Sequence, residues 1–172
     1  APVWGQATVP EARHLGASCG GIRINSVYVP NGRQLLDPHM DYKVEWLARL
    51  RDAAQGWLAQ GPTMVMGDWN IAPQDEDVWS MEFYADKSHV SPRERAAFAA
   101  MLDAGYVDVV RPLLPGPKVY TYWDYQQLRF QKGRGMKIDF ILASPDVAGR
   151  VAAAAIDREE RKGKGASDHA PV

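Results

Sequence analysis

Apolar and polar positions follow regular patterns in several segments of the chain, and these patterns predict the order of its elements. Residues 22–30, "IRINSVYVP", alternate as a half-buried strand does, and "PNGR" then supplies turn residues. From Asp37 to about Leu58, apolar residues recur at spacings of three and four, which predicts a helix covering one face of a sheet. Residues 63–67, "TMVMG", form a short apolar run typical of a strand at the centre of a sheet.

A second helix is predicted in the middle of the chain. Ser91, Pro92 and Glu94 match a capping box with proline at the first helical position, and Gly105 marks the end of this helix. The segment "VYTYWDY" at residues 119–125 follows a loop and is rich in aromatic residues, as strands are.

The last third of the chain predicts further strands. The segment "KIDFILAS" at residues 137–144 alternates until Pro145, and another strand is predicted over residues 151–159. Strands and helices thus alternate in the first half and strands dominate the second, with no internal repeat. This order predicts an α/β domain whose sheet is covered by helices and whose polar strand ends carry the site.

Composition narrows the class of protein but not its chemistry. The 172 residues are 46% hydrophobic and 24% charged, which suits one globular domain over residues 1–172. The net charge of -1 gives no whole-molecule field that favours nucleic acid or membrane. Cys19, the single cysteine, has no partner for an internal disulfide, and no segment matches a signal peptide or a membrane span. We therefore expect a cytoplasmic monomer that does not bind membranes.

Four acidic or imidazole residues stand at the edges of apolar segments. Asp68 follows "MVMG", Asp139 lies inside "KIDFIL", and Asp168 and His169 are adjacent in "SDHAP". Each has an ordinary explanation, because an aspartate after a strand is more often a turn or cap residue and a neighbouring Asp and His often form a surface pair. Asp139 is harder to explain, since a carboxylate among apolar neighbours needs a partner, for which a histidine is the obvious candidate.

Together these residues indicate hydrolysis of a phosphate ester. Carboxylate oxygens suit a hard divalent ion such as Mg²⁺, the amide of Asn70 can orient a water molecule, and an Asp-His pair provides an oriented acid or base. Such a set can present a nucleophile, neutralise charge on the phosphate oxygens and assist the leaving oxygen. With one cysteine in the chain, no thiolate cluster favours zinc.

Three segments, "GDWNIAP", "KIDFILAS" and "SDHAPV", occur in the order and at about the separations of the exonuclease III family, which this chain resembles. That family belongs to the endonuclease/exonuclease/phosphatase superfamily. The resemblance includes "VYVPNGR", "SPRERAAFAAMLDAGYVDVVR" and "YTYWDYQ", and it covers nearly all of the chain from Gly20 to Val172. It implies a two-sheet α/β sandwich and a nuclease of DNA repair that depends on Mg²⁺, with Mn²⁺ as an alternative. The implied substrate is duplex DNA, cut 5′ to abasic sites or shortened from 3′ ends.

The resemblance also implies a role for each candidate residue. Asp68 would activate the attacking water or protonate the leaving group, and Asn70 would orient that water. His169 would stabilise the transition state through a non-bridging phosphate oxygen, while Asp139 would hold the imidazole in the useful tautomer. Tyr28 would present its phenol to the phosphate. The implied metal ligands are Asp68, Asn70, Asp168 and His169.

Contacts to DNA are implied around this site. Asn31 would contact the backbone, and Trp123 would line the pocket for a flipped-out abasic sugar. Arg129, Arg134 and Lys137 would meet phosphates and give a salt-dependent grip, although by composition alone such basic segments are solvated loops. Without the resemblance, Trp123 reads as an ordinary core aromatic.

The chain departs from the family on its N-terminal side. The family carries a "WN" strand and a "QE" segment with the principal metal-binding glutamate; residues 1–21 match neither, and Glu11 follows a proline in a different context. The chain also starts at Ala1 and ends at Val172 in "APV", which reads as a strand just beginning. We therefore expect a C-terminal fragment with little activity of its own. The alternatives are a non-catalytic or complementing DNA-binding module, and a phosphatase or lipid phosphodiesterase of the same superfamily.

Overall fold

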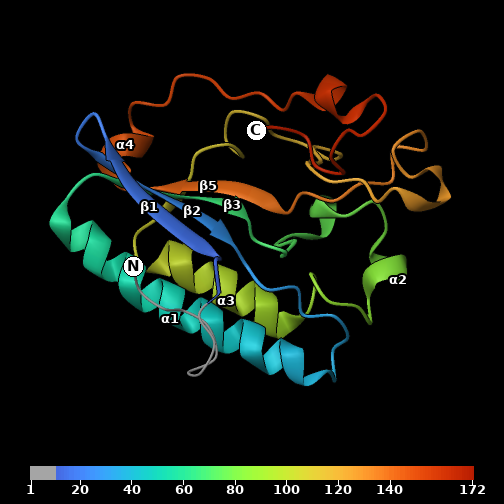
Figure 1. Cartoon of the computed structure of the whole chain (residues 1–172), viewed down its shortest axis with the longest axis horizontal. Helices are drawn as coiled ribbons and strands as arrows, with labels where there is room; N and C mark the ends of the chain where they lie inside the picture. Colours follow the sequence, from blue (N-terminus) through green and yellow to red (C-terminus); the bar gives the residue numbers. More distant parts are fainter. Residues whose placement is uncertain (1–10) are drawn as a thin grey trace.

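One five-stranded sheet organises the computed structural model, which describes residues 11–172 (Figure 1). The strand order is β1-β2-β3-β5-β4. Strands β2 and β3 run parallel, and the other neighbours are antiparallel. The strands are β1 (His14–Cys19), β2 (Ile22–Tyr28), β3 (Thr63–Asp68), β4 (Val107–Asp108) and β5 (Asp139–Ala143).

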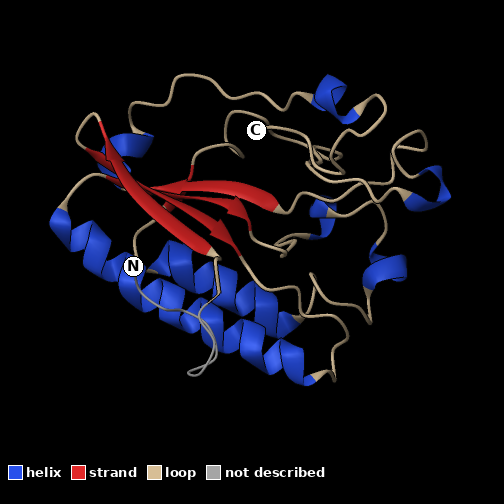
Figure 2. Cartoon of the chain, viewed as in Figure 1, coloured by secondary structure: helices blue, strands red, loops and turns tan. Residues whose placement is uncertain are grey.

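Two long helices lie side by side against one face of this sheet (Figure 2). Helix α1 (Pro38–Gln60) begins after Asp37, whose carboxylate accepts the backbone N–H of His39 at 2.8 Å. Helix α3 (Pro92–Asp103) begins with the predicted capping box of Ser91 and Glu94. Helix α1 was predicted from apolar spacing and helix α3 from its capping box, and both are confirmed.

The main core lies between these helices and the sheet. Trp46 and Leu50 of α1 and Phe98 of α3 pack with Phe140 of β5 in one buried cluster. Trp69, which follows β3, is fully buried in the same cluster and packs edge-on against Phe98. The loop that carries the polar residues after β3 is thus anchored by a large apolar side chain.

Loops and short helices cover the other face and the ends of the strands (Figure 1). They include α2 (Met81–Tyr84), α4 (Pro145–Ala148) and short 3₁₀ helices at Asp75–Asp77, Gln126–Leu128 and Arg158–Arg161. None of the helices in residues 11–172 is long and apolar enough to cross a membrane.

The α/β class predicted from the sequence is confirmed, with differences in the strands. Residues 119–125 do not form the predicted strand; only Tyr122 makes isolated bridges, to Met136 and His169. Residues 151–159 do not form one either, because no strand of the described chain pairs with them. Strand β1 was not predicted, since its residues are exposed at the sheet edge and carry no apolar alternation. The described residues contain one sheet of the two expected.

Candidate active site

Polar side chains meet at one edge of the sheet, where three strands end or begin. Tyr28 ends β2 and pairs with Asp68 at the end of the parallel strand β3. Asp68 in turn pairs with Asp139, the first residue of the antiparallel strand β5. The topology therefore brings together residues separated by up to 111 positions, from 28 to 139. The phenol-bearing side chain of Tyr28 is 53% exposed at this edge, with the Arg13 guanidinium 5.0 Å from its ring.

His169 joins this edge from the C-terminal segment. Its Nδ1 lies 2.9 Å from Asp139 Oδ2, and its Nε2 lies 4.0 Å from Asp68 Oδ2. Burial lowers the pKa of His169, but the hydrogen bond to Asp139 and the charges of both aspartates outweigh burial and raise this pKa overall. The carboxylate of Asp139 fixes the ring so that Nε2 faces Asp68. The structure thus brings together the pair that the sequence suggested.

Asp68 carries the most strongly perturbed carboxyl at this edge. Burial raises its pKa to about 7, and the negative charge of Asp139 adds to this effect. The carboxylate accepts two hydrogen bonds from Asn70: from the backbone N–H at 2.8 Å and from Nδ2 at 3.0 Å. At neutral pH both protonation states of Asp68 are therefore populated, which suits a group that exchanges protons.

Asn70 is buried and held from several directions. Its backbone has φ of 50°, in the left-handed region that asparagine tolerates better than most residues. Its Nδ2 also donates to the carbonyl of Val29 at 2.9 Å, and its Oδ1 accepts from Asn31 Nδ2 at 3.2 Å. The amide oxygen therefore faces Asn31, while the NH₂ group faces Asp68. In this orientation Asn70 orients the carboxylate and does not point its oxygen at a cation beside Asp68.

The predicted metal site is only partly formed. Among residues 11–172, no group of three or more His, Cys, Asp or Glu side chains is arranged to hold a metal ion. Asp68 and Asp139 lie close enough for like-charge repulsion, and a divalent cation beside them would relieve it. Asp168 lies near the site, since its charge contributes to the raised pKa of His169. Glu11 pairs with Arg13. These donors do not complete a shell for Mg²⁺.

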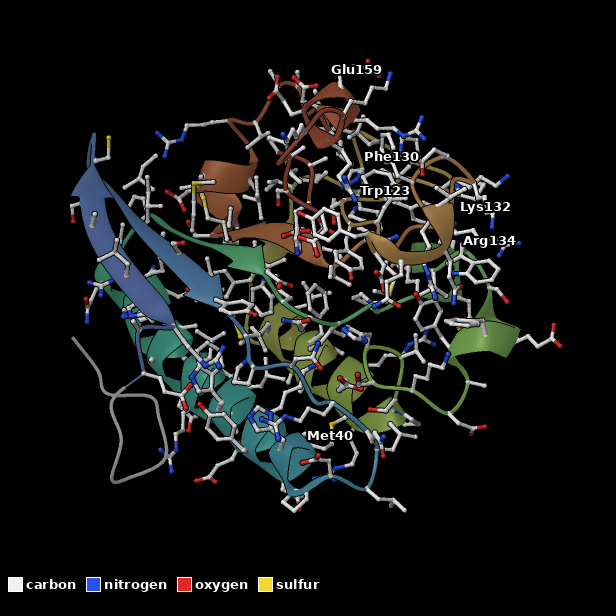
Figure 3. The ribbon with its side chains drawn as sticks, turned by 45° about the vertical axis from the view of Figure 1, so that its right-hand side comes forward. Met40, Trp123, Phe130, Lys132, Arg134 and Glu159 are labelled. Carbon is white, nitrogen blue, oxygen red and sulfur yellow. The ribbon has the colours of Figure 1, made fainter. Side chains whose placement is uncertain are left out.

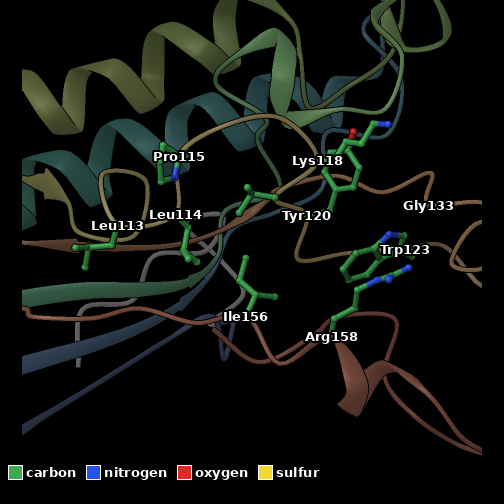
Figure 4. A pocket seen from close by; sticks show the side chains of 10 residues that line it. Leu113, Leu114, Pro115, Lys118, Tyr120, Trp123, Gly133, Ile156 and Arg158 are labelled. Atoms are coloured by element: carbon green, nitrogen blue, oxygen red, sulfur yellow. The ribbon is translucent and has the colours of Figure 1, made fainter.

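Two neighbouring aromatic residues, Tyr122 and Trp123, lie differently with respect to His169. The rings of Tyr122 and His169 lie 5.0 Å apart, edge to face. Trp123 is 2% exposed and packs against Phe130. It lines an apolar cavity of about 550 Å³ together with Tyr120, Ile156 and other residues (Figure 4). That Trp123 lines the pocket for an abasic sugar stays a prediction, and the contact of Tyr122 with His169 was not foreseen from the sequence.

The predicted DNA-binding cations differ in their exposure. Arg134 is exposed, with its guanidinium 4.7 Å from the Trp79 ring, and Figure 3 shows it with Lys132 at the periphery of the molecule. Arg129 is only 8% exposed and donates to the Tyr84 hydroxyl at 3.2 Å. Lys137 is 1% exposed and its amine lies 5.1 Å from the Phe140 ring. Arg134 is thus the one of the three that is exposed in this structure, and the phosphate contacts of all three stay predictions.

His89 is a residue of this site that the sequence did not suggest. Its Nε2 lies 3.2 Å from Asn70 Oδ1 and 3.5 Å from Asn31 Nδ2. The residue has φ of 83° and lies in the loop that precedes α3. The sequence offers little signal for it, because "KSHVSP" reads as a linker before a capping box.

Comparison with known proteins gives a consistent match. The model of the Endonuclease/Exonuclease/phosphatase family matches residues 4–169. An exodeoxyribonuclease of Bacillus subtilis (strain 168) is 28% identical over 163 residues, which are 94% of this chain and 63% of the relative.

Solved structures extend this match. The 3′-5′ exonuclease NExo from Neisseria meningitidis has a TM-score of 0.91 at 36% identity, covering 95% of this chain and 64% of that one. NExo is also described as a 3′ phosphatase in a structure bound to product DNA hairpin, with a TM-score of 0.92. An AP endonuclease from Archaeoglobus fulgidus has a TM-score of 0.89 at 30% identity, covering 96% and 66%. The chain thus spans somewhat less than two thirds of the length of each of these relatives.

Proposed function

This chain belongs to the Endonuclease/Exonuclease/phosphatase family, and on that premise we propose that it hydrolyses phosphate esters of DNA in repair. The observation that carries the proposal is the constellation of Asp68, Asp139 and His169 at one sheet edge, with His169 Nδ1 2.9 Å from Asp139 and Nε2 4.0 Å from Asp68. It joins an oriented imidazole to a carboxyl whose pKa lies at about 7. Both are groups that phosphoester hydrolysis requires.

The reaction we propose is attack of water on the phosphorus of a bound phosphoester. His169, whose raised pKa favours the protonated ring, donates from Nε2 to a non-bridging phosphate oxygen and stabilises the charge that develops there. Asp68 either accepts the proton of the attacking water or gives a proton to the leaving oxygen, and a pKa of about 7 permits both. Asn70 holds the Asp68 carboxylate through two hydrogen bonds. Tyr28, exposed beside them, directs its hydroxyl to the phosphate.

We further propose that a divalent cation, Mg²⁺ or alternatively Mn²⁺, takes part in the reaction. Nucleases of this family are generally dependent on divalent metal ions, and a bound cation would neutralise charge on the phosphate. Because the described residues do not complete a metal shell, we assign no step to the ion.

For the substrate we propose 3′ ends of duplex DNA first and abasic sites second. The structural neighbours at 35% and 36% identity are described as a 3′ phosphatase and a 3′-5′ exonuclease, whereas the neighbour described as an AP endonuclease is 30% identical. Because of the neighbour described as an AP endonuclease, abasic-site cleavage remains the alternative. In both cases the group attacked is a phosphoester of duplex DNA.

One experiment tests the proposal and separates these substrates. Three labelled duplexes, with a recessed 3′ hydroxyl, a 3′ phosphate and one internal abasic site, are incubated with the chain in Mg²⁺, Mn²⁺ or a chelator, beside Asp68→Asn. We expect slow loss of 3′ nucleotides or 3′ phosphate, in keeping with the low activity expected of a fragment; this loss needs the cation and is at least 100-fold slower still in the variant, about 2.7 kcal/mol. DNA binding without any cleavage by the folded chain would instead indicate a non-catalytic module.

A further inference from the structure

Beneath the candidate site, Lys43 of α1 and Glu94 of α3 form a fully buried ion pair. Lys43 Nζ lies 2.5 Å from Glu94 Oε1, and both side chains are 0% exposed. Burial of such a pair adds little to stability, because the cost of removing both charges from water roughly offsets their attraction. An apolar pair of similar volume would fill this space at least as well.

Both charges bind the backbone around Asn70. The second hydrogen bond of Lys43 Nζ is to the backbone carbonyl of Asn70, at 2.6 Å. Both oxygens of Glu94 accept the backbone N–H of His89 at 3.0 Å. The buried ion pair thus holds the backbone of both Asn70 and His89, whose side chains contact each other. Both residues have a left-handed backbone, with φ of 50° at Asn70 and 83° at His89.

The His89 ring sets the orientation of the Asn70 amide. Its Nδ1 lies 3.2 Å from the Ser88 hydroxyl and its Nε2 lies 3.2 Å from Asn70 Oδ1. With Ser88 donating to Nδ1, Nε2 carries the hydrogen and donates to the amide oxygen. The NH₂ group of Asn70 is thereby left facing Asp68, at 3.0 Å.

We propose that Lys43, Glu94 and His89 are positioning residues that hold Asn70 so that its amide NH₂ faces the carboxylate of Asp68. This inference rests on the proposed function for its kinetic consequence, but the orientation of Asn70 can be measured without any turnover. The three residues touch neither phosphate nor reacting atoms in this scheme. They act through Asn70, and Lys43 also lies close enough to Asp68 for its positive charge to act on that carboxylate directly.

The first test is a matched pair of substitutions at His89. His89→Gln keeps a side-chain N–H that can donate to Asn70 Oδ1, whereas His89→Leu removes it, and both bear the same backbone strain at φ of 83°. We expect the side-chain ¹⁵N–¹H signals of Asn70 in His89→Leu to shift and to exchange with solvent at least tenfold faster, and those of His89→Gln to stay close to the parent. Unchanged Asn70 signals in a folded His89→Leu variant would overturn the proposal.

The second test removes the ion pair as a unit. Because a lone buried charge can prevent folding, the double variant Lys43→Met with Glu94→Leu replaces both charges by apolar groups. We expect this variant to fold and its Asn70 side-chain signals to shift. Its kcat on the duplex substrates should fall at least tenfold, with KM changed less than twofold. Leu47→Ala, in the same helix and 1% exposed, controls for loss of core packing and should leave Asn70 and kcat unchanged.

The two readouts separate this inference from the proposed function. If Asn70 responds as expected but the parent chain cleaves no duplex, the positioning role stands and the proposed function fails. If the parent cleaves DNA and the double variant keeps both its kcat and its Asn70 signals, the positioning role fails alone. The positioning role would also be overturned if kcat fell by the same factor in the double variant as in Leu47→Ala.

Discussion

Asp68 and Asp139 are directly opposed partners on adjacent antiparallel strands, so the sheet itself places two carboxylates side by side. Their side chains are only 15% and 18% exposed, and water therefore screens their repulsion weakly. His169 lies between them. An arrangement that weakens the folded state and serves no packing purpose is typical of a functional site.

This opposition predicts that Asp68→Asn stabilises the chain at alkaline pH. An unfolded aspartate ionises near pH 4, but in the folded chain the pKa of Asp68 is about 7. Between these values the folded state binds the proton more tightly, so its stability falls as pH rises from about 4 to about 7. Ionisation of Asp68 therefore lowers the stability of the parent chain by about 4 kcal/mol at most. The Asp68→Asn variant avoids this loss but gives up one hydrogen bond from Asn70, so we expect it to be about 1–2 kcal/mol more stable than the parent at pH 8.

Urea unfolding at pH 4.5 and pH 8, with a chelator present, measures this difference. The gain should be near zero at pH 4.5. Asp52→Asn on the exposed surface of α1 is the control and should change stability by less than about 0.5 kcal/mol at both pH values. A gain that is equal at both pH values would mean that charge at Asp68 does not destabilise the fold.

A second prediction concerns the hydrogen bond from His169 to Asp139. Asp139→Asn removes the negative charge that raises the pKa of His169, so a histidine titration by NMR should show this pKa lower than in the parent. Because the imidazole loses its orientation while the exposed DNA-binding surface is unchanged, kcat should fall at least tenfold, about 1.4 kcal/mol, with KM within threefold. Equal losses in kcat and in affinity would argue for a general structural defect.

Much of this site was accessible from the sequence, because its residues sit where apolar patterns break. The end of "MVMG" located Asp68, and the cost of burying Asp139 among apolar neighbours pointed to a histidine partner. The pairing of Asp68 with Asp139 depends on the order of strands in the sheet, and the alternation of apolar and polar residues does not predict that order. Helices α1 and α3 were equally readable, since capping chemistry and apolar spacing act within a few residues.

Sequence patterns do not supply the direction or burial of a side chain where these depend on distant contacts. Nothing in "YTYWDY" distinguishes Tyr122, which faces His169, from Trp123, which packs inward. Arg129 and Lys137 look like solvated cations in the sequence, yet aromatic rings of Phe83 and Phe140 cover them. Lys43 lies on the apolar face of a helix, and only the fold reveals its partner 51 residues away.

A third prediction concerns Gly67, the residue before Asp68. It has φ of 137°, and a Cβ there would lie 2.0 Å from the backbone oxygen of Val27. The strand pairing between β2 and β3 leaves no room to relieve this contact, so Gly67→Ala should destabilise the chain by about 2–4 kcal/mol. Gly56→Ala, in α1 with open space around it, should instead stabilise by about 0.5–1 kcal/mol. Thermal unfolding of both variants checks the pair, and a Gly67→Ala protein as stable as the parent would contradict the geometry.

The last prediction distinguishes exposed from buried cations in DNA binding. Arg134 is exposed beside Trp79, whereas Arg129 is buried against Phe83 and Tyr84. A cation that neutralises one phosphate releases counterions, so Arg134→Ala should reduce the slope of log K against log salt concentration by about 0.9. Arg129→Ala should lower stability and leave the slope unchanged, because Arg129 is only 8% exposed.

Fluorescence titration of a labelled duplex at several salt concentrations measures these slopes, and Asp68→Asn serves as the background so that cleavage does not interfere. Arg51→Ala, on helix α1 and paired with Asp52, controls for loss of one positive charge far from the site. If Arg51→Ala reduces the slope as much as Arg134→Ala, the effect comes from net charge and not from a phosphate contact. If Arg129→Ala reduces it instead, the loop around Arg129 must open when DNA binds, and the buried position seen here belongs to the free protein alone.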